Sequence, residues 1–199
     1  RGLCGAIHSS VSKFTKKFVE TLPAGQTAEI VVLGDKAKPQ IARTCRKNIV
    51  MSFNQVGKDI PTFTDAIGIV QLIGAQQAKG KTVDSANVSA VASPNIQVIY
   101  NTFQSVISYE TRPIHIYSDA QLKSTSPKLT SYEYEDVDLE AYSQFLFASQ
   151  VFKALVEGHA AEMSAKRMAM ENASKNSDAI VLNLTMLYNR TRQSVITNE

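Results

Sequence analysis

The sequence predicts an α/β sheet domain followed by one long C-terminal helix. Short apolar runs rich in β-branched residues alternate with segments of helical spacing through the first 131 residues, which is the pattern of a sheet covered by helices. The last 58 residues, 142–199, contain no proline and a single glycine, Gly158. The composition is that of a globular protein, because 44% of the 199 residues are hydrophobic.

Three helices are predicted in the sheet domain. A glycine-containing loop over 2–7 precedes the first helix, which we expect over 9–19. A basic helix is expected over 36–47, with Pro39 in its first turn, where the missing N–H costs little. Apolar residues at helical spacing predict a third, amphipathic helix over 62–78.

Five apolar runs predict the strands. The run 28–33 is typical of a strand covered on both faces, which favours a parallel sheet, and 49–53 is the next strand. The runs 96–100, 106–109 and 114–117 have short connections, which favour antiparallel pairing at one side of the sheet. Together with the helices, these strands predict a Rossmann-like domain.

The boundary between the sheet domain and the long helix is predicted in a polar stretch. Residues 123–131 are rich in Ser, Thr and Lys, and five acidic residues follow within the next nine positions. We therefore divide the chain into a Rossmann-like α/β domain over 1–131, an acidic connector over 132–141 and a long helix over 142–199. Residues 79–94 are small and polar, and they fit no element of this scheme.

The long helix is predicted to leave the domain, because an unbroken helix over 142–199 would measure about 85 Å at 1.5 Å per residue. Its C-terminal half carries small and apolar residues at alternating steps of three and four, as in the seam of a two-helix coil. A second stripe widens the apolar face and predicts a further contact. A helix that breaks at Gly158 and packs on its own domain is the alternative. The seam consists of Met170, Ala173, Ser177, Ile180, Leu184, Leu187, Thr191 and Ser194, and the second stripe consists of Val181, Tyr188 and Val195.

Charge and cysteine content exclude several classes of protein. Residues 1–131 carry 15 basic and 8 acidic side chains, yet the whole chain has a net charge of only +3 and a pI near 8.8, so we expect no nucleic-acid partner. No uncharged run approaches the roughly 20 apolar residues of a membrane span, so we expect no direct membrane insertion. Cys4 and Cys45 lack metal-ligand spacing and predict reduced thiols rather than a disulfide or zinc site.

The residues that could carry catalysis are scattered. His8, His115 and His159 show no ligand spacing, so a packing or surface position is expected for each. The loop over 2–7 lacks the lysine and hydroxyl of a phosphate-binding loop, and a structural strand-to-helix turn is favoured over a phosphate site. Such a turn follows a strand, so we expect a segment before Arg1. We expect no active site, no cofactor and no metal.

Three blocks of sequence resemble one family. They are RGLCGAIHSSVSK over 1–13, EMSAKRMAMENASKN over 162–176 and YNRTRQSVITNE over 188–199. In order and at matching ends of the chain, these blocks resemble the gamma subunit of the rotary ATP synthase, and its mitochondrial members in particular. The resemblance extends over nearly all 199 residues.

The resemblance implies a rotor shaft without bond chemistry of its own. In that family an N-terminal helix and the C-terminal helix form an antiparallel coiled coil inside a ring of alternating alpha and beta subunits, and a Rossmann-like domain lies at its foot. Rotation of the asymmetric shaft, driven by proton flow, couples to ATP synthesis or hydrolysis in the ring. The implied partners are the alpha and beta subunits, and at the foot the delta and epsilon subunits and the membrane c-ring. The implied location is the matrix side of the mitochondrial inner membrane.

The resemblance also implies five contact residues. Arg192 and Gln193 match a pair that binds a beta-subunit loop, and arginine suits bidentate carboxylate contact. Thr197 and Glu199 match positions implicated in coupling, and Arg167 matches a basic residue that lies toward beta carboxylates. From the sequence alone, solvated helix surface is the alternative for all five. A nucleotide-binding Rossmann-type enzyme and a homomeric coiled-coil protein remain the alternative functions.

Overall fold

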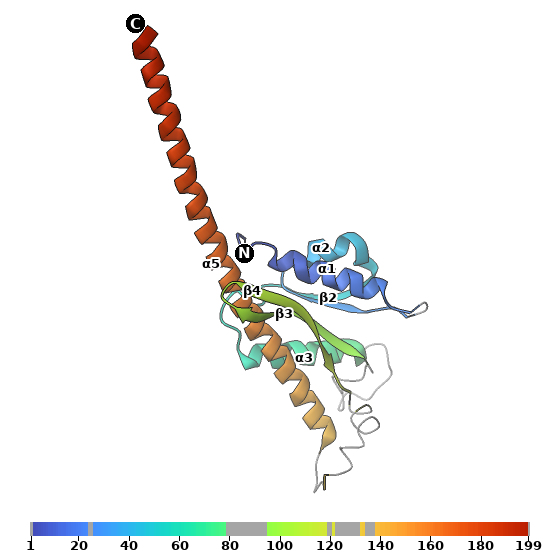
Figure 1. Cartoon of the computed structure of the whole chain (residues 1–199). Helices are drawn as coiled ribbons and strands as arrows, with labels where there is room; N and C mark the ends of the chain where they lie inside the picture. The colour runs from blue at the N-terminus through green and yellow to red at the C-terminus, as the bar shows by residue number, and fades with distance from the viewer. Residues whose placement is uncertain are drawn as a thin grey trace.

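A small α/β domain packs against the first half of one very long helix, and the second half of that helix projects away from it (Figure 1). This computed structural model describes residues 2–23, 26–78, 95–118, 121, 132–133 and 138–198. We call the α/β domain, formed by the described residues up to 118, the foot. The unassigned stretch 79–94 and residues 134–137 of the connector lie outside the described residues.

The three helices expected in the foot are all present. They are α1 (Ile7–Glu20), α2 (Ala37–Cys45) and α3 (Phe63–Ala78), and a 3₁₀ turn, η1 (Arg46–Asn48), extends α2. The loop before α1 contains two residues with positive φ, at Leu3 and Gly5, and therefore bends sharply into the helix.

The start of α3 is set by a reciprocal cap between Thr62 and Asp65. The Asp65 carboxylate accepts hydrogen bonds from the Thr62 backbone N–H at 2.9 Å and from its hydroxyl at 2.7 Å. The Asp65 N–H donates to Thr62 Oγ1 at 3.3 Å. This capping box satisfies two donors at the helix end, and the first of these bonds is the main cause that lowers the pKa of Asp65.

The first two strands form a parallel pair, as expected. Strand β1 (Ile30–Leu33) pairs with β2 (Ile49–Phe53), with Leu33 opposite Phe53 at one end. Helix α2 connects the two strands, and its buried Ile41 packs against Val32 of β1. The β1–α2–β2 unit therefore carries a small core of its own.

The three runs expected at one side of the sheet form two strands instead, so that part of the prediction is wrong. Strand β3 (Ile96–Ser105) pairs antiparallel with β4 (Ser108–Ile116), and residues 106–107 form the turn. Pro113, which lies opposite Ile99, does not end β4. In a two-stranded sheet β4 is an edge strand, where a missing N–H is tolerated. The antiparallel pairing itself is confirmed.

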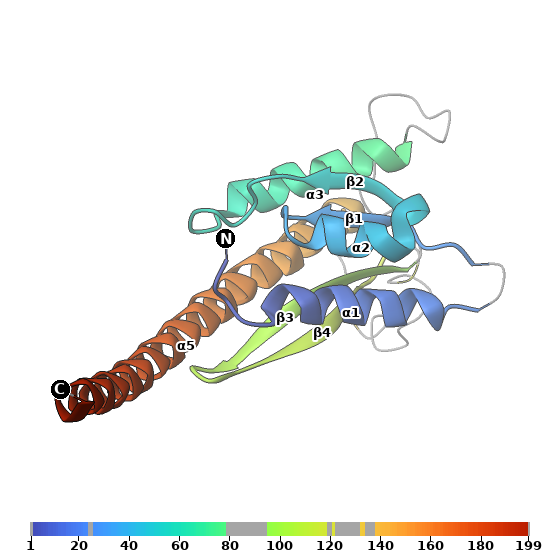
Figure 2. The same cartoon turned by 90° about the horizontal axis from the view of Figure 1, so that it is seen from above.

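Within the described residues, the two strand pairs are separate two-stranded sheets (Figure 2). A groove of about 580 Å³ lies between them and is lined mainly by apolar side chains. It is bordered by Val11 of α1, Val32 of β1, Ile69 of α3, Val98 of β3 and Val151 of the long helix. The single continuous sheet that we expected is not formed by these four strands alone.

The main core joins the foot to the long helix α5 (Leu139–Asn198). Phe147 of α5 is 1% exposed and lies among buried residues of α3 and β4. The ring of Phe63 makes edge-to-face contacts with Phe145 and Phe152, at centroid distances of 6.0 and 5.6 Å. The buried members of this core are Ala66, Ile69, Val70, Ile116, Phe147, Ala148 and Val151.

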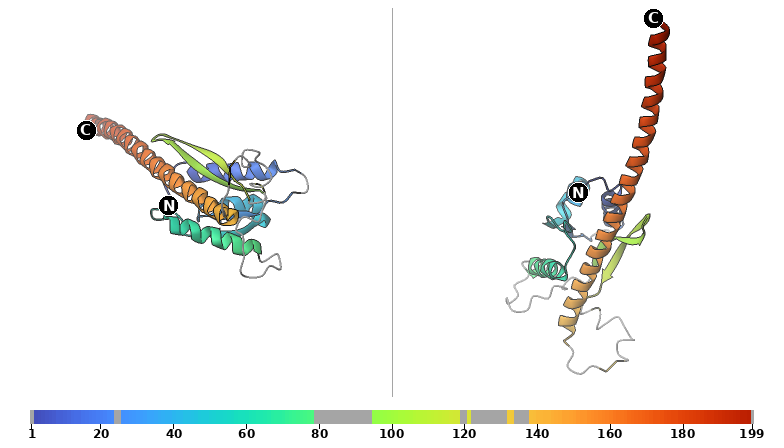
Figure 3. Two further views of the ribbon diagram at one scale, coloured as in Figure 1. Left: turned by 90° about the horizontal axis from the view of Figure 1, so that it is seen from below. Right: turned by 90° about the vertical axis from the view of Figure 1, so that its left-hand side faces the viewer.

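Helix α5 is continuous through all of its 60 residues, which corresponds to about 90 Å. The break at Gly158 that we considered is absent, because the helix passes through this residue without interruption. The helix begins at Leu139, three residues before the expected start, since the Asp138 carboxylate accepts hydrogen bonds from the N–H groups of Glu140 and Ala141 at 3.0 and 3.2 Å. Figure 3 shows its gentle curve along the whole length.

Candidate functional site

Helix α5 changes from a buried to a fully exposed element along its length. Its last buried residues are Ala161 and Glu162, and every residue from Met170 to Asn198 is exposed. We call residues 170–198 the free shaft. The free shaft projects from the foot as a single helix (Figure 1), so its whole circumference is available to other chains.

The free shaft exposes many large apolar side chains to solvent. Ten of its large apolar side chains are between 40% and 66% exposed. Exposed apolar surface of this extent marks an interaction surface rather than ordinary solvated helix. The ten residues are Met170, Ile180, Val181, Leu182, Leu184, Met186, Leu187, Tyr188, Val195 and Ile196.

All members of the predicted coil seam lie on the free shaft and are exposed. The three threonines of the free shaft do not reach another element. Thr185, Thr191 and Thr197 each donate a hydroxyl hydrogen bond to the carbonyl four residues earlier, at 2.8, 2.9 and 2.7 Å. Their polar groups are therefore satisfied within the helix, and their methyl groups remain available for contact.

Three of the five predicted contact residues form one group near the end of the free shaft. Arg192, Gln193 and Thr197 are all exposed. Gln193 and Thr197 are one turn apart and are linked, because the Thr197 hydroxyl donates to the Gln193 carbonyl. The fourth, Glu199, lies outside the described residues.

Arg167 is separate from this group. It lies 25 residues before Arg192 on the same helix, which corresponds to about 37 Å. Close to it, Lys175 binds Glu171 at 2.8 Å across one helical turn. The Lys175 hydrogen bond and charge lower the pKa of Glu171, and the charge of Arg167 adds to this effect. The structure therefore places the predicted contacts at two levels of the shaft.

The turn of the β3–β4 hairpin braces α5 just below the free shaft. The Ser164 hydroxyl donates a hydrogen bond to the Val106 carbonyl in this turn. The neighbouring Ile107 is 77% exposed, so the hairpin turn also presents an apolar side chain to the surroundings. This contact ties the hairpin turn to α5 close to the start of the free shaft.

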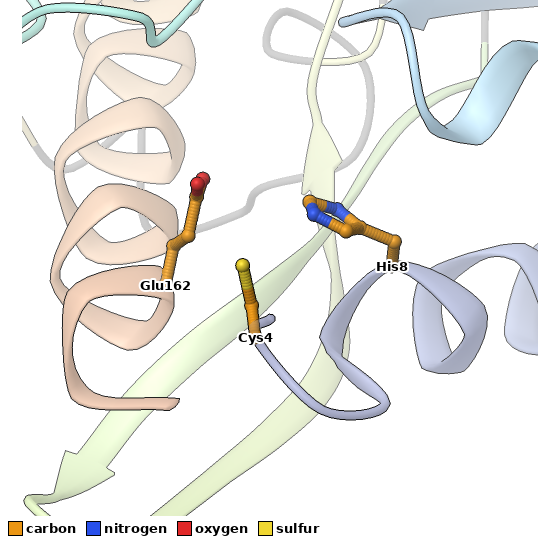
Figure 4. Close-up of side chains that lie close together, drawn as sticks. All are labelled: Cys4, His8 and Glu162. Atoms are coloured by element: carbon orange, nitrogen blue, oxygen red, sulfur yellow. The ribbon is translucent and has the colours of Figure 1, made fainter. Parts of the chain in front are cut away.

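The structure also brings together three residues that the sequence interpretation kept apart. The ligand atoms of Cys4, His8 and Glu162 all lie within 4.8 Å of one another (Figure 4). We expected a packing histidine and an isolated thiol here. The Cys-x₃-His spacing at the start of α1 could have indicated that Cys4 and His8 lie close together. Glu162, however, lies more than 150 residues away in the sequence, so no spacing pattern connects it to them.

Comparison with known proteins identifies the family. A family model described as ATP synthase matches residues 1–199. The mitochondrial ATP synthase subunit gamma of Pichia angusta is 39% identical over 201 residues, an alignment that covers 100% of this chain and 68% of that protein. The chain belongs to the ATP synthase gamma-subunit family.

Other gamma subunits match over the same extent. The mitochondrial subunit of Rattus norvegicus is 38% identical and that of Saccharomyces cerevisiae is 36% identical, in both cases over 100% of this chain. The chain spans 68% of the rat protein and 60% of the yeast protein, so it corresponds to about two thirds of a gamma subunit. The resemblance found in the sequence is confirmed.

Chains in two solved structures share the fold of this chain. A chain from the Euglena gracilis mitochondrial ATP synthase, solved as OSCP/F1/c-ring in rotational state 3, matches with a TM-score of 0.74 at 19% identity, over 100% of this chain and 66% of that one. A chain from the central stalk and c-ring of the Tetrahymena thermophila enzyme matches with a TM-score of 0.64 at 24% identity, over 87% of this chain and 72% of that one.

None of the helices in the described part of this gamma-subunit chain combines the length and apolar character needed to cross a membrane.

Proposed function

We propose that this chain acts as the central-stalk rotor subunit of ATP synthase, with α5 as its shaft and the foot as its base. The main observation behind this proposal is the free shaft, in which 29 successive helical residues are exposed and ten of these have large apolar side chains. A helix of this kind gains most of its packing from surrounding chains. Membership of the gamma-subunit family supports the assignment over a nucleotide-binding enzyme or a homomeric coil.

The proposed mechanism is mechanical and makes no covalent bond. The shaft would stand inside a hexamer of alpha and beta subunits and turn within it. A given orientation favours one conformation of a beta subunit only if it contacts that conformation better than the alternatives. The helix is curved (Figure 3) and has unequal faces, so its apolar stripe and its polar groups would meet each surrounding subunit in turn.

We further propose that a second, antiparallel helix covers the coil seam of the free shaft. The seam contains small residues such as Ala173 and Ser177, which permit close approach of a partner helix, and larger ones such as Leu184 and Leu187. The second stripe, Val181, Tyr188 and Val195, then remains for contact with the hexamer.

The foot is proposed to be a Rossmann-like base for this shaft. The parallel β1–α2–β2 unit supports this, and the apolar groove between the two strand pairs suits a further strand. We assign the delta and epsilon subunits and the membrane c-ring as its neighbours. The complex is proposed to lie on the matrix side of the mitochondrial inner membrane, in line with the mitochondrial relatives.

The contact residues are proposed to act at two levels. Arg192, Gln193, Thr197 and Glu199 would bind beta subunits near the end of the shaft, and Arg167 would bind beta carboxylates nearer to the foot. The separation of about 37 Å allows the two sets to meet different parts of the same subunit. A guanidinium on an exposed helix can pair with a carboxylate in two parallel hydrogen bonds.

The test is the double variant Arg192→Ala with Gln193→Ala in the assembled complex. Because hydrogen bonds to charged groups contribute about 1.5–3 kcal/mol, we expect ATP turnover or its coupling to proton flow to fall about 10- to 100-fold. Arg190→Ala is the control for the loss of a positive charge, since Arg190 is exposed and lies about 200° around the helix from Arg192. We expect this control to stay within about twofold of the unmodified complex.

Two results would count against the assignment. Unchanged turnover and coupling in the double variant would remove the proposed contact. Equal losses in the double variant and in Arg190→Ala would show a general effect of charge on the shaft instead of a specific contact.

A further inference from the structure

We propose that Cys4, His8 and Glu162 form a zinc-binding site that fastens α1 to α5 at the point where the shaft leaves the foot. The three residues come from the loop before α1, the first turn of α1 and the last buried turn of α5 (Figure 4). Their ligand atoms lie within 4.8 Å of one another.

The donor set suits zinc. Thiolate sulfur, imidazole nitrogen and carboxylate oxygen are the three ligand types that Zn²⁺ accepts, and three protein ligands with a water molecule make a four-coordinate site. Bond lengths of about 2.0–2.3 Å place the ligands of a tetrahedral zinc roughly 3.3–3.8 Å apart. The present separations therefore need to contract by about 1–1.5 Å at most, which rotation of the Glu162 and His8 side chains can supply.

The surroundings of the cluster suit a bound cation better than a solvated set of side chains. Cys4 is 4% exposed and Glu162 is 7% exposed, and Cys4 packs with Ile7 and Ala161 in a small apolar cluster. His8 is half-buried.

A nucleophilic thiol is a weaker interpretation of the same three residues. Neither of the cavities beside α3 and between the strand pairs is lined by any of the three side chains. Cys4 is buried and its thiol donates a hydrogen bond to the Gly2 carbonyl at 3.1 Å. The buried sulfur is thus poorly placed to meet a substrate, whereas a single ion needs only the space between the three ligand atoms.

Binding would exchange one proton for one metal ion. The Cys4 thiol gives up its proton to solvent and its hydrogen bond to Gly2, and the thiolate then binds zinc together with neutral imidazole and the Glu162 carboxylate. No oxidant or reductant takes part. The result is a link between two elements that share few other contacts, immediately below the exposed part of the shaft.

The test measures zinc on the full-length subunit in its assembled complex. The complex is treated with a zinc-selective chelator, reloaded with zinc alone and desalted, and its zinc is counted by mass spectrometry. We expect one zinc ion more per subunit in the unmodified complex than in Cys4→Ser. Loss of a residue that only hydrogen-bonds a metal ligand weakens metal binding roughly 10- to 100-fold. Loss of a ligand itself should weaken zinc binding by more than this.

The chain offers two matched controls. Cys45→Ser removes the other buried cysteine, and His159→Asn removes a histidine one turn before Glu162 on the same helix. Both should keep the full zinc content. Cobalt supplies a second readout, because a thiolate-to-cobalt absorption band should form in the unmodified complex and in both controls, but not in Cys4→Ser.

Three outcomes would overturn the proposal. They are equal zinc content in the unmodified complex and Cys4→Ser, equal zinc loss in Cys45→Ser, and absence of the cobalt band from the unmodified complex. If Cys4→Ser fails to assemble, the near-isosteric Glu162→Gln decides the question. Reduced zinc affinity in this variant supports the site, and unchanged affinity rejects it.

Discussion

The two halves of α5 belong to one unbroken helix, yet they are held in different ways. The first half buries Phe147, Val151 and other side chains against the foot. The free shaft, 170–198, has no buried residue, and its side-chain hydrogen bonds and its ion pair connect residues one turn apart. The difference shows that tertiary packing within this chain ends before the helix does. The packing of the first half against the foot sets the position of the shaft, and the surface of the free shaft remains exposed in this chain.

The polar contacts of the foot differ from those of the free shaft in the same way. Asn101 is 6% exposed and joins three segments. Its amide donates to the Ile7 carbonyl at 2.9 Å, and its oxygen accepts from the hydroxyls of Ser10 at 3.3 Å and Thr111 at 2.7 Å. These bonds hold the start of α1 against the hairpin. In the free shaft, by contrast, each threonine hydroxyl stabilises only its own turn.

The largest difference between the two halves should appear on truncation of an apolar side chain. Phe147→Ala removes a ring that is 1% exposed, so we expect the free energy of unfolding of the full-length subunit to fall by about 3–5 kcal/mol. Leu182→Ala is the control, because Leu182 is 66% exposed and lies opposite the predicted coil seam. It should change stability by no more than about 0.5 kcal/mol in urea unfolding. Similar losses in both variants would show that the shaft packs within the isolated subunit.

A smaller difference is expected for hydrogen bonds. Asn101→Ala leaves a buried carbonyl and two hydroxyls without this partner, so we expect a loss of about 1–3 kcal/mol in the free energy of unfolding. Thr185→Val removes a hydroxyl that, among the described residues, donates to the Val181 carbonyl one turn earlier, and we expect a change within about 0.5 kcal/mol. Hydrogen exchange of the first turn of α1 should speed up in Asn101→Ala only. Unaltered exchange there would mean that Asn101 does not hold α1 to the hairpin.

The smallest effect concerns Gly158, which lies near the end of the packed half of α5. A Cβ added to Gly158 meets no atom within 4 Å, and the residue lies inside the helix. We expect Gly158→Ala to raise the free energy of unfolding by about 0.5–1 kcal/mol, because alanine loses less backbone entropy in a helix. Thermal unfolding measures this. A destabilised variant would indicate that the helix bends sharply at Gly158, and the packed and free halves would then be separate helices.

Much of this protein follows from local sequence. Helical sequence patterns were enough to predict α1, α2 and α3, with Pro39 marking the first turn of α2, and β-branched runs located β1 and β2. The absence of proline over 142–199 was enough to predict a long helix, and short motifs at both ends indicated the family. These features depend on neighbours in the chain, and hydrophobic periodicity and backbone propensity express such relations directly. The exposed positions of Arg167, Arg192, Gln193 and Thr197 agree with the predicted contact surface, but their partners remain a prediction.

Other features were decided only by the tertiary structure. The pairing of β3 with β4 continues through Pro113 because that residue lies in an outer strand, a property that the dipeptide Arg112-Pro113 does not reveal. The meeting of Cys4 and His8 with Glu162 depends on how α5 crosses the start of α1. The level at which α5 leaves the foot likewise depends on where the hairpin turn ends beside Ser164. Each of these results from contacts between residues distant in sequence, and periodicity within one segment carries no information about which distant segment will lie against it.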